Sequence, residues 1–411
     1  MATILPFKAI RPTKEEAAVI AALPYDVYSR KEAYEKVKEQ PNSFLSIDRP
    51  ETQFAEDVDM YSDAVYNKAA DMLNQWISDG RFMQDADDFY YVYELTMDGR
   101  SQTGIVACSS IDDYQNSVIK KHENTRAEKE QDRIRHVDTC SAQTGPIFLA
   151  YKADSTISGV VSKIKSRQPV YDFTAEDGIR HRCWVIDRMM DKALIATAFD
   201  KMDSIYIADG HHRAASAVKV GLKRRAENPN YTGKEDFNFF LSVLFPDEEL
   251  KIYDYNRVLK DLNGLAPEEL LEELDSIVEI LETSDCPIRP RKKGQWSMLL
   301  EETWYLCQVK SELMVDDPVE GLDVSLLQNL VLEPLLGITD PKTDDRIDFV
   351  GGIRGLEELE RRCNSDCKVA FAMYPTSIQE LFDVADAGLL MPPKSTWFEP
   401  KLRSGLFIHK I

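Results

Sequence analysis

A stretch near the middle of the chain decides the fold: Ile205-Tyr206-Ile207-Ala208-Asp209-Gly210-His211-His212-Arg213, followed by Ala214-Ala215-Ser216-Ala217-Val218-Lys219-Val220. The β-branched residues predict a strand and the alanine-rich segment predicts a helix, so the polar residues lie at a strand-to-helix turn. A helix N-terminus presents free N–H groups that bind anions, and Gly210 lets the backbone approach such a ligand closely. His211, His212 and Arg213 add hydrogen-bond donors. We therefore predict a phosphate-binding turn; the alternative is that Asp209 only caps the helix beside a polar surface patch.

Strands and helices alternate on both sides of this turn, which predicts a mixed α/β or α+β core. Strands are expected at residues 4–10, 89–95, 103–108, 147–151, 170–173, 183–186 and 204–207, and helices at residues 31–40, 54–77, 157–165 and 188–199. Residues 237–245 and 250–255 resemble the two strands of a hairpin. The polar stretch from Lys260 to Pro267 is the best domain boundary. It gives a core domain over residues 1–260 and a C-terminal α+β domain over residues 261–411.

The composition restricts the possible partners. The chain has 411 residues and a net charge of −21, and an acidic protein lacks the basic surface that nucleic-acid phosphates require, so we expect no nucleic-acid partner. No long apolar window and no signal-peptide pattern occurs, so we predict no membrane span and a cytoplasmic location. The seven cysteines form no Cys-x-x-Cys pair, as expected of reduced thiols. Cys363 and Cys367 could share a helix face, but no second pair completes a zinc site.

The segment His122-Glu123-Asn124-Thr125 is a second candidate site. His122 and Glu123 form an acid/base pair directly ahead of a charged helix. On that helix Arg126 and Arg133 have the spacing of one face, so a solvated, salt-bridged helix is the alternative interpretation.

Two connecting segments are further candidates. Tyr25 and Asp26 follow a proline that disfavours helix, and Asp26 either caps the next helix or faces a substrate. Near the C-terminus, two prolines stiffen a loop that displays Lys394, Ser395 and Thr396 ahead of a Trp-Phe pair. This loop is either a simple connection or a lid that closes over an anion.

These motifs carry a family resemblance. The strand, Asp-Gly-His-His-Arg, helix element resembles the phosphate-binding turn of the ParB/sulfiredoxin superfamily, in the version found in free-serine kinases. The wider pattern is similar to the prokaryotic family catalogued as domain of unknown function one thousand and fifteen, and it comprises Pro6 to Pro12, Leu23 to Val27, His122 to Thr125, Asp209 to Arg213 and Met391 to Lys401. The resemblance implies a ParB/sulfiredoxin-like nucleotide-binding core with additional helices and strands. Asn256 departs from the pattern, which has a histidine there.

The resemblance also implies an activity. Residues Gly210 to Arg213 would bind the phosphates of ATP or ADP, and Asp209 would orient them or hold Mg²⁺. The expected reaction is transfer of a phosphoryl group to the hydroxyl of a small metabolite, with free L-serine as the best candidate. On chemical grounds Glu123 is the expected base, with His122 and Asp209 as further catalytic candidates. The remaining candidates are Lys394, Ser395 and Thr396 at the phosphates, and Tyr25, Asp26 and Thr125 at the substrate.

Two other functions stay open at this point. One is a ParB-type nucleotide-binding regulatory module without turnover, although no basic recognition helix accompanies it here. The other is sulfiredoxin-type repair, which needs a cysteine where His211 and His212 stand. No Gly-x-x-x-x-Gly-Lys loop or His-Arg-Asp motif is present, so the common phosphoryl-transfer folds are excluded at the level of motifs. A homodimer is a further possibility.

Overall fold

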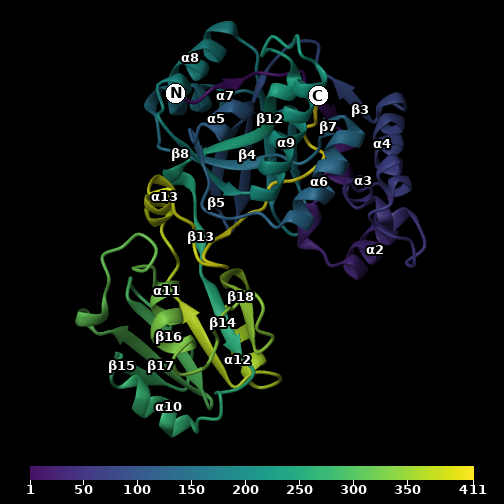
Figure 1. Ribbon diagram of the computed structural model, residues 1–411. Helices are drawn as coiled ribbons and strands as arrows, with labels where there is room; N and C mark the ends of the chain where they lie inside the picture. The colour runs from purple at the N-terminus through teal and green to yellow at the C-terminus, as the bar shows by residue number, and fades with distance from the viewer. The chain divides into compact units, whose positions relative to one another are not determined.

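The computed structural model describes residues 1–411, which separate into two compact units (Figure 1). The first unit comprises residues 1–250 and 400–411, and the second comprises residues 251–399. The boundary therefore lies ahead of the predicted one at residue 260, because Tyr255–Leu259 is already a strand of the second unit's sheet. The end of the chain returns to the first unit. Both units contain helices and strands, so the predicted α+β class is confirmed.

A nine-stranded mixed sheet forms the first unit's core. Its strand order is β6-β11-β8-β12-β5-β4-β10-β9, with β1 added beside β5. The strands are β1 (Ile4–Leu5), β4 (Tyr90–Met97), β5 (Arg100–Ser110), β6 (Ile119–Lys120), β8 (Ile147–Tyr151), β9 (Tyr171–Thr174), β10 (Arg180–Ile186), β11 (Ile205–Asp209) and β12 (Phe239–Pro246). Met97 pairs with Arg100, so β4 and β5 form a hairpin.

Helices surround this sheet. They are α1 (Ala17–Ile20), α2 (Arg30–Glu39), α3 (Leu45–Asp48), α4 (Asp63–Ser78), α5 (Ile111–Gln115), α6 (Ala127–Cys140), α7 (Ser155–Lys165), α8 (Met189–Asp200) and α9 (His211–Glu227). The single-turn helices are η1 (Tyr25–Val27), η2 (Pro50–Gln53), η3 (Asp236–Asn238) and η4 (Asp247–Glu249). Two short pairs, β2 (Ile10–Pro12) with β3 (Phe82–Gln84) and β7 (Ala142–Gln143) with β21 (His409–Lys410), complete the unit.

The alanines of α9 explain its place on the sheet. Ala214, Ala217 and Val218 belong to the same apolar cluster as Ile205 and Ile207 of β11. Small side chains let this helix approach the strands closely, and burial of the shared apolar surface stabilises the contact. The turn between β11 and α9 is therefore held from both sides by packed elements.

An antiparallel six-stranded sheet forms the second unit, in the order β15-β17-β16-β19-β14-β18. The strands are β14 (Tyr255–Leu259), β15 (Val278–Ser284), β16 (Gln295–Leu300), β17 (Thr303–Val309), β18 (Ile347–Gly351) and β19 (Val369–Met373), beside a short pair of β13 (Ile252–Tyr253) and β20 (Trp397–Phe398). The helical elements are α10 (Pro267–Leu274), η5 (Ser311–Leu313), α11 (Asp323–Leu327), the π-helical η6 (Gln328–Leu332), η7 (Gly352–Arg354), α12 (Glu357–Cys363) and α13 (Ile378–Asp386).

One expected pairing is wrong. Residues 237–245 and 250–255 do not form a hairpin, because β12 pairs with β5 and β8 inside the first sheet while β13 pairs with β20. The segment between them is the single-turn helix η4, which ends the strand. Both runs have strand-like composition, and composition alone does not specify the partner strand.

The structure also bears on the cysteines, on metal binding and on membrane spans. All seven cysteines are free, and α12 ends at Cys363, so Cys367 lies beyond the helix instead of one turn along it. No group of three or more His, Cys, Asp or Glu side chains is arranged to hold a metal ion. None of the helices has the length and apolar composition needed to cross a membrane.

Candidate functional site

The turn between β11 and α9 joins the strand to an uncapped helix N-terminus. Gly210 adopts φ 94° and ψ 33°, in the left-handed region that favours glycine. A Cβ atom at this position would lie 3.0 Å from two guanidinium nitrogens of Arg213. No side chain caps the first turn of α9, so its N–H groups are left for a ligand or water. The prediction of a strand, a tight turn and a helix is correct in type and in position.

Arg213 is the central cation of this turn. Its Nη1 donates to the carbonyl oxygen of Pro146 at 2.5 Å, and its Nη2 donates to Oδ2 of Asp209 at 3.2 Å. Its Nε is buried and has no hydrogen-bond partner. Burial alone would lower the pKa of the guanidinium, but the carboxylates of Asp209 and Asp26 raise it. The guanidinium of Arg213 therefore stays positively charged, and its Nε–H group has no hydrogen-bond acceptor.

Asp209 faces two cations. Besides Arg213, Nζ of Lys401 lies 3.8 Å from its Oδ2. Burial raises the pKa of Asp209, but Lys401 and Arg213 outweigh this effect and lower it to about 2. A carboxylate engaged in this way orients the cations and is a poor proton acceptor. The carboxylate of Asp209 is thus already paired with two cations, and the chain has no cluster of side chains suited to hold a metal ion.

His122 and His211 lie in contact beside the turn. Their ring centroids are 4.5 Å apart at 83°, and the backbone N–H of His122 donates to Nε2 of His211 at 3.4 Å. Nδ1 of His211 lies 3.7 Å from Oε2 of Glu123. Burial is the main cause that lowers the pKa of His122 to about 3 and that of His211 to about 4. Both rings are therefore neutral near pH 7, and both nitrogens of His122 lack a partner.

These pKa values predict a pH dependence of stability. Unfolded histidine titrates near 6.5, so between about pH 6.5 and pH 3 the unfolded chain binds a proton that folded His122 excludes. The free energy of unfolding of the first unit should fall as the pH is lowered through this window. His122→Gln should reduce that slope by up to about 1.4 kcal/mol per pH unit.

Urea titrations at pH 7 and pH 5 test this expectation when unfolding of the first unit is followed by hydrogen exchange in its peptides. The free energy of unfolding should change less between the two pH values in the variant than in the parent, whatever their absolute stabilities. Equal slopes would mean that His122 is not excluded from protonation in the folded chain.

The other predicted residues are divided between the two units. Nε2 of His212 accepts from the backbone N–H of Arg126 at 2.9 Å, which ties the turn to the start of α6. Thr125 donates to Glu130 at 2.7 Å and so supports the same corner. Asp26 is exposed. Burial lowers the pKa of His212, and the charge of Asp26 opposes this effect without reversing it. The role expected of His212 at the phosphates and the roles expected of Thr125 and Asp26 at a substrate stay predictions.

Lys394, Ser395 and Thr396 belong to the second unit. Nη2 of Arg257 donates to the carbonyl oxygen of Lys394 at 3.1 Å, and Oγ of Ser395 donates to Pro392 at 2.6 Å. These contacts lie within that unit, and the expectation that the loop covers the phosphates stays a prediction. Lys401, in the C-terminal segment that belongs to the first unit, lies beside the turn, with its Nζ near Asp209.

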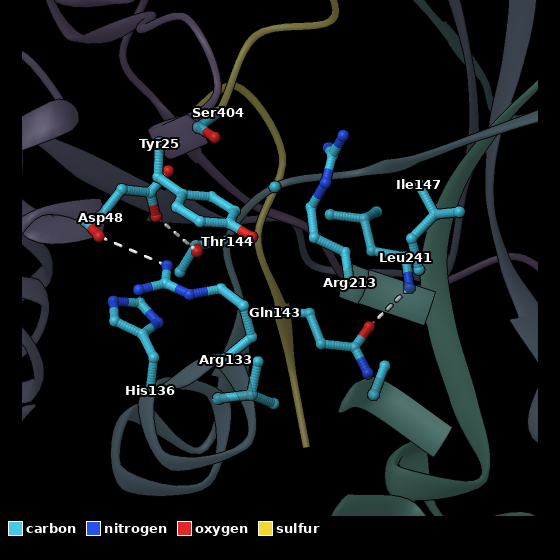
Figure 2. Close-up of a pocket in the computed structure, with 13 residues that line it drawn as sticks. Tyr25, Asp48, Arg133, His136, Gln143, Thr144, Ile147, Arg213, Leu241 and Ser404 are labelled. Atoms are coloured by element: carbon cyan, nitrogen blue, oxygen red, sulfur yellow. Dashed lines mark hydrogen bonds between the residues drawn. The ribbon is translucent and has the colours of Figure 1, made fainter. Parts of the chain in front are cut away.

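A small cavity beside the turn contains residues that the sequence did not single out. Figure 2 shows Arg213 on one side of it and Tyr25, Asp48 and Arg133 on the other. The guanidinium carbon of Arg133 lies 4.0 Å from the ring centroid of Tyr25. Tyr25 is thus the only predicted substrate residue that lines this cavity. Arg133 lies in a charged helical segment, and no sequence pattern there predicts that its side chain is buried.

Comparisons with known proteins give one family and several distant structures. A family model described as "Protein of unknown function (DUF1015)" matches residues 4–325. No curated protein matches the chain. Free serine kinase in complex with AMP is 15% identical, with a TM-score of 0.34 and coverage of 74% of this chain and 91% of that one. A point mutant of free serine kinase in complex with ADP is 15% identical, with a TM-score of 0.36 and coverage of 74% and 92%. SbnI with C-terminal truncation from Staphylococcus aureus is 11% identical, with a TM-score of 0.39 and coverage of 74% and 86%.

Proposed function

We propose that this chain, which belongs to the family described as "Protein of unknown function (DUF1015)", is a nucleotide-dependent phosphotransferase. In this proposal the chain binds ATP or ADP at the turn between β11 and α9 and transfers a phosphoryl group to a small hydroxyl compound. Free L-serine is the acceptor that we favour. The observation that carries the proposal is the buried Arg213, with an unpartnered Nε, in the uncapped first turn of α9. Such a donor set suits a phosphate, which accepts several hydrogen bonds at once.

Phosphoryl transfer requires charge neutralisation and in-line positioning more than covalent chemistry from the protein. In our proposal Arg213 and the N–H groups of the first turn of α9 supply the neutralisation. Asp209 holds Arg213 in place, and Mg²⁺ enters as the nucleotide complex, since the chain provides no metal cluster of its own.

The proton of the acceptor hydroxyl needs a base. Glu123 is suited to this role because its side chain is 43% exposed and lies 3.7 Å from His211 at the edge of the turn. His211 then lies beside this carboxylate as a neutral neighbour.

The test is direct. Purified protein is incubated with ATP or ADP, Mg²⁺ and a mixture of amino acids, and phosphorus NMR is used to look for a new phosphomonoester. The proposal expects this signal with one acceptor and its absence when the acceptor is omitted. Nucleotide binding without any phosphomonoester would favour a regulatory module, and absence of nucleotide binding would contradict both.

A further inference from the structure

Lys401 is a second cation beside the turn between β11 and α9. Its Nζ lies 3.8 Å from Oδ2 of Asp209, and Nη2 of Arg213 donates to the same oxygen at 3.2 Å. Since both distances end on one atom, the two nitrogens are at most about 7 Å apart. A phosphate that accepts hydrogen bonds of about 2.8 Å at two of its oxygens spans donors up to roughly 8 Å apart. The separation of the two cations is therefore within the reach of one phosphate group.

Negative charge around Arg213 makes this arginine a poor phosphate ligand by itself. Burial lowers the pKa of its guanidinium, but the carboxylates of Asp209, Asp26 and Asp48 raise it. The nearby His211 adds no positive charge near pH 7, because burial lowers its pKa to about 4. The carboxylates that stabilise the guanidinium also repel an incoming phosphate. A second cation beside the turn offsets this repulsion.

Lys401 has the position and the accessibility that this second cation needs. Burial raises the pKa of Asp209, and the charge of Lys401 is the largest of the effects that lower it to about 2. The ammonium group therefore acts on the turn more strongly than a distant surface charge would. The side chain of Lys401 is 20% exposed, so a ligand can reach it from solvent.

The backbone near Lys401 is fixed by the C-terminal segment, residues 400–411, which belongs to the first unit. Within this segment Nε of Arg403 donates to Nε2 of His181 at 3.2 Å, and the same guanidinium pairs with Asp177. Arg403 is 4% exposed. The lysine thus stands two residues from a buried anchor, which lowers the entropy lost when it contacts a ligand.

Ser404 ties the same segment to the surroundings of Arg213. Its N–H donates to the carbonyl oxygen of Ala22 at 2.8 Å. Ser404 and Arg213 line the same small cavity (Figure 2). A Cβ atom on Gly145 would lie 3.0 Å from Oγ of Ser404 and 3.8 Å from Cδ of Arg213, so both side chains pack against this glycine. The segment that carries Lys401 is therefore in register with the arginine of the turn.

We propose that Lys401 is a phosphate-binding residue of the nucleotide site and shares one phosphate with Arg213. The inference rests on the proposed function, because this phosphate belongs to the nucleotide bound at the turn. Asp209 contacts both cations and sets their spacing. The C-terminal segment thereby supplies a ligand to a site whose other donors lie at the start of α9.

Calorimetric titrations of the full chain with ADP and with inorganic pyrophosphate, both without Mg²⁺, test the proposal. Lys401→Met keeps the length of the side chain and removes its charge, so both dissociation constants should rise by about tenfold or more. Lys401→Arg should keep them within about threefold of the parent, because a guanidinium also binds phosphate. Lys410→Met is the matched control at an exposed position of the same segment, and it should change neither constant by more than about twofold.

The same titrations in an Asp209→Asn background separate a direct contact from an indirect one. If Lys401 contacts the phosphate, Lys401→Met should weaken pyrophosphate binding by about tenfold in this background as well. If Lys401 serves only as the counter-ion of Asp209, its effect should disappear once the carboxylate is gone, and the proposal is overturned. Hydrogen exchange in residues 400–411 checks that the segment stays packed, and Lys401→Gln takes the place of Lys401→Met if that variant does not fold.

Unchanged affinities of Lys401→Met for both probes would also overturn the proposal. The inference and the proposed function can fail separately. The expected affinities without any phosphomonoester would refute only the proposed function. A phosphomonoester formed by Lys401→Met with the nucleotide affinity and rate of the parent would refute only this inference, and a parent that binds neither probe would contradict both.

Discussion

Arg213→Lys should raise the dissociation constant for ATP or ADP by roughly 10- to 100-fold, equivalent to about 1.4–2.8 kcal/mol. The substitution keeps the positive charge but removes the planar fork. Lysine carries its donors on one terminal nitrogen, so it cannot hold Pro146 and Asp209 and also present a third donor from the position of Nε. Calorimetry on the variant and the parent measures the effect.

The matched control is Arg225→Lys, near the C-terminal end of the same helix. Arg225 pairs with Asp112 and Asn238, far along α9 from the turn, so its replacement should leave nucleotide affinity unchanged. Hydrogen exchange in α9 separates a local change from loss of the helix. Equal affinities of Arg213→Lys and the parent, with α9 intact, would remove Arg213 from the phosphate site.

The turn could be predicted because its determinants are local in sequence. A β-branched strand, a glycine and an alanine-rich helix specify the backbone within sixteen residues, Ile205 to Val220, and this order alone places Asp209 and Arg213 at a helix N-terminus. The structure adds that Gly210 has positive φ, as a turn of this kind requires.

Residues brought together by tertiary packing could not be found in the same way. Asp48 ends the short helix α3, Arg133 lies within α6 and Lys401 stands near the C-terminus, so they meet the turn only after α6 packs along α9 and the chain end returns. In the sequence Arg133 is one charge among many in a polar helix. No periodicity distinguishes the arginine that stacks on Tyr25 from its exposed neighbours. The same reason explains the wrong hairpin, since strand composition does not specify which strand is the partner.

Glu123→Gln should lower kcat by about 10²- to 10⁴-fold while the nucleotide dissociation constant changes by less than about twofold. The amide retains the shape of the side chain beside His211 but cannot accept the proton of the acceptor hydroxyl. The rate of phosphomonoester formation and calorimetric titration with nucleotide measure the two quantities separately. Glu128→Gln, at an exposed position in the first turn of α6, is the control for loss of one negative charge near the site.

A rate near that of the parent would assign the proton to another group, and the geometry ranks the remaining candidates. Asp209 is held by two cations with its pKa lowered to about 2, so it binds a proton weakly. His122 is buried with its pKa lowered to about 3, so taking up a proton would create an unpaired charge in the interior. Asp26 is exposed and its charge acts on His212 and Arg213. Asp26→Asn would then be the variant that loses turnover, because Asp26 is the carboxylate that remains among these candidates.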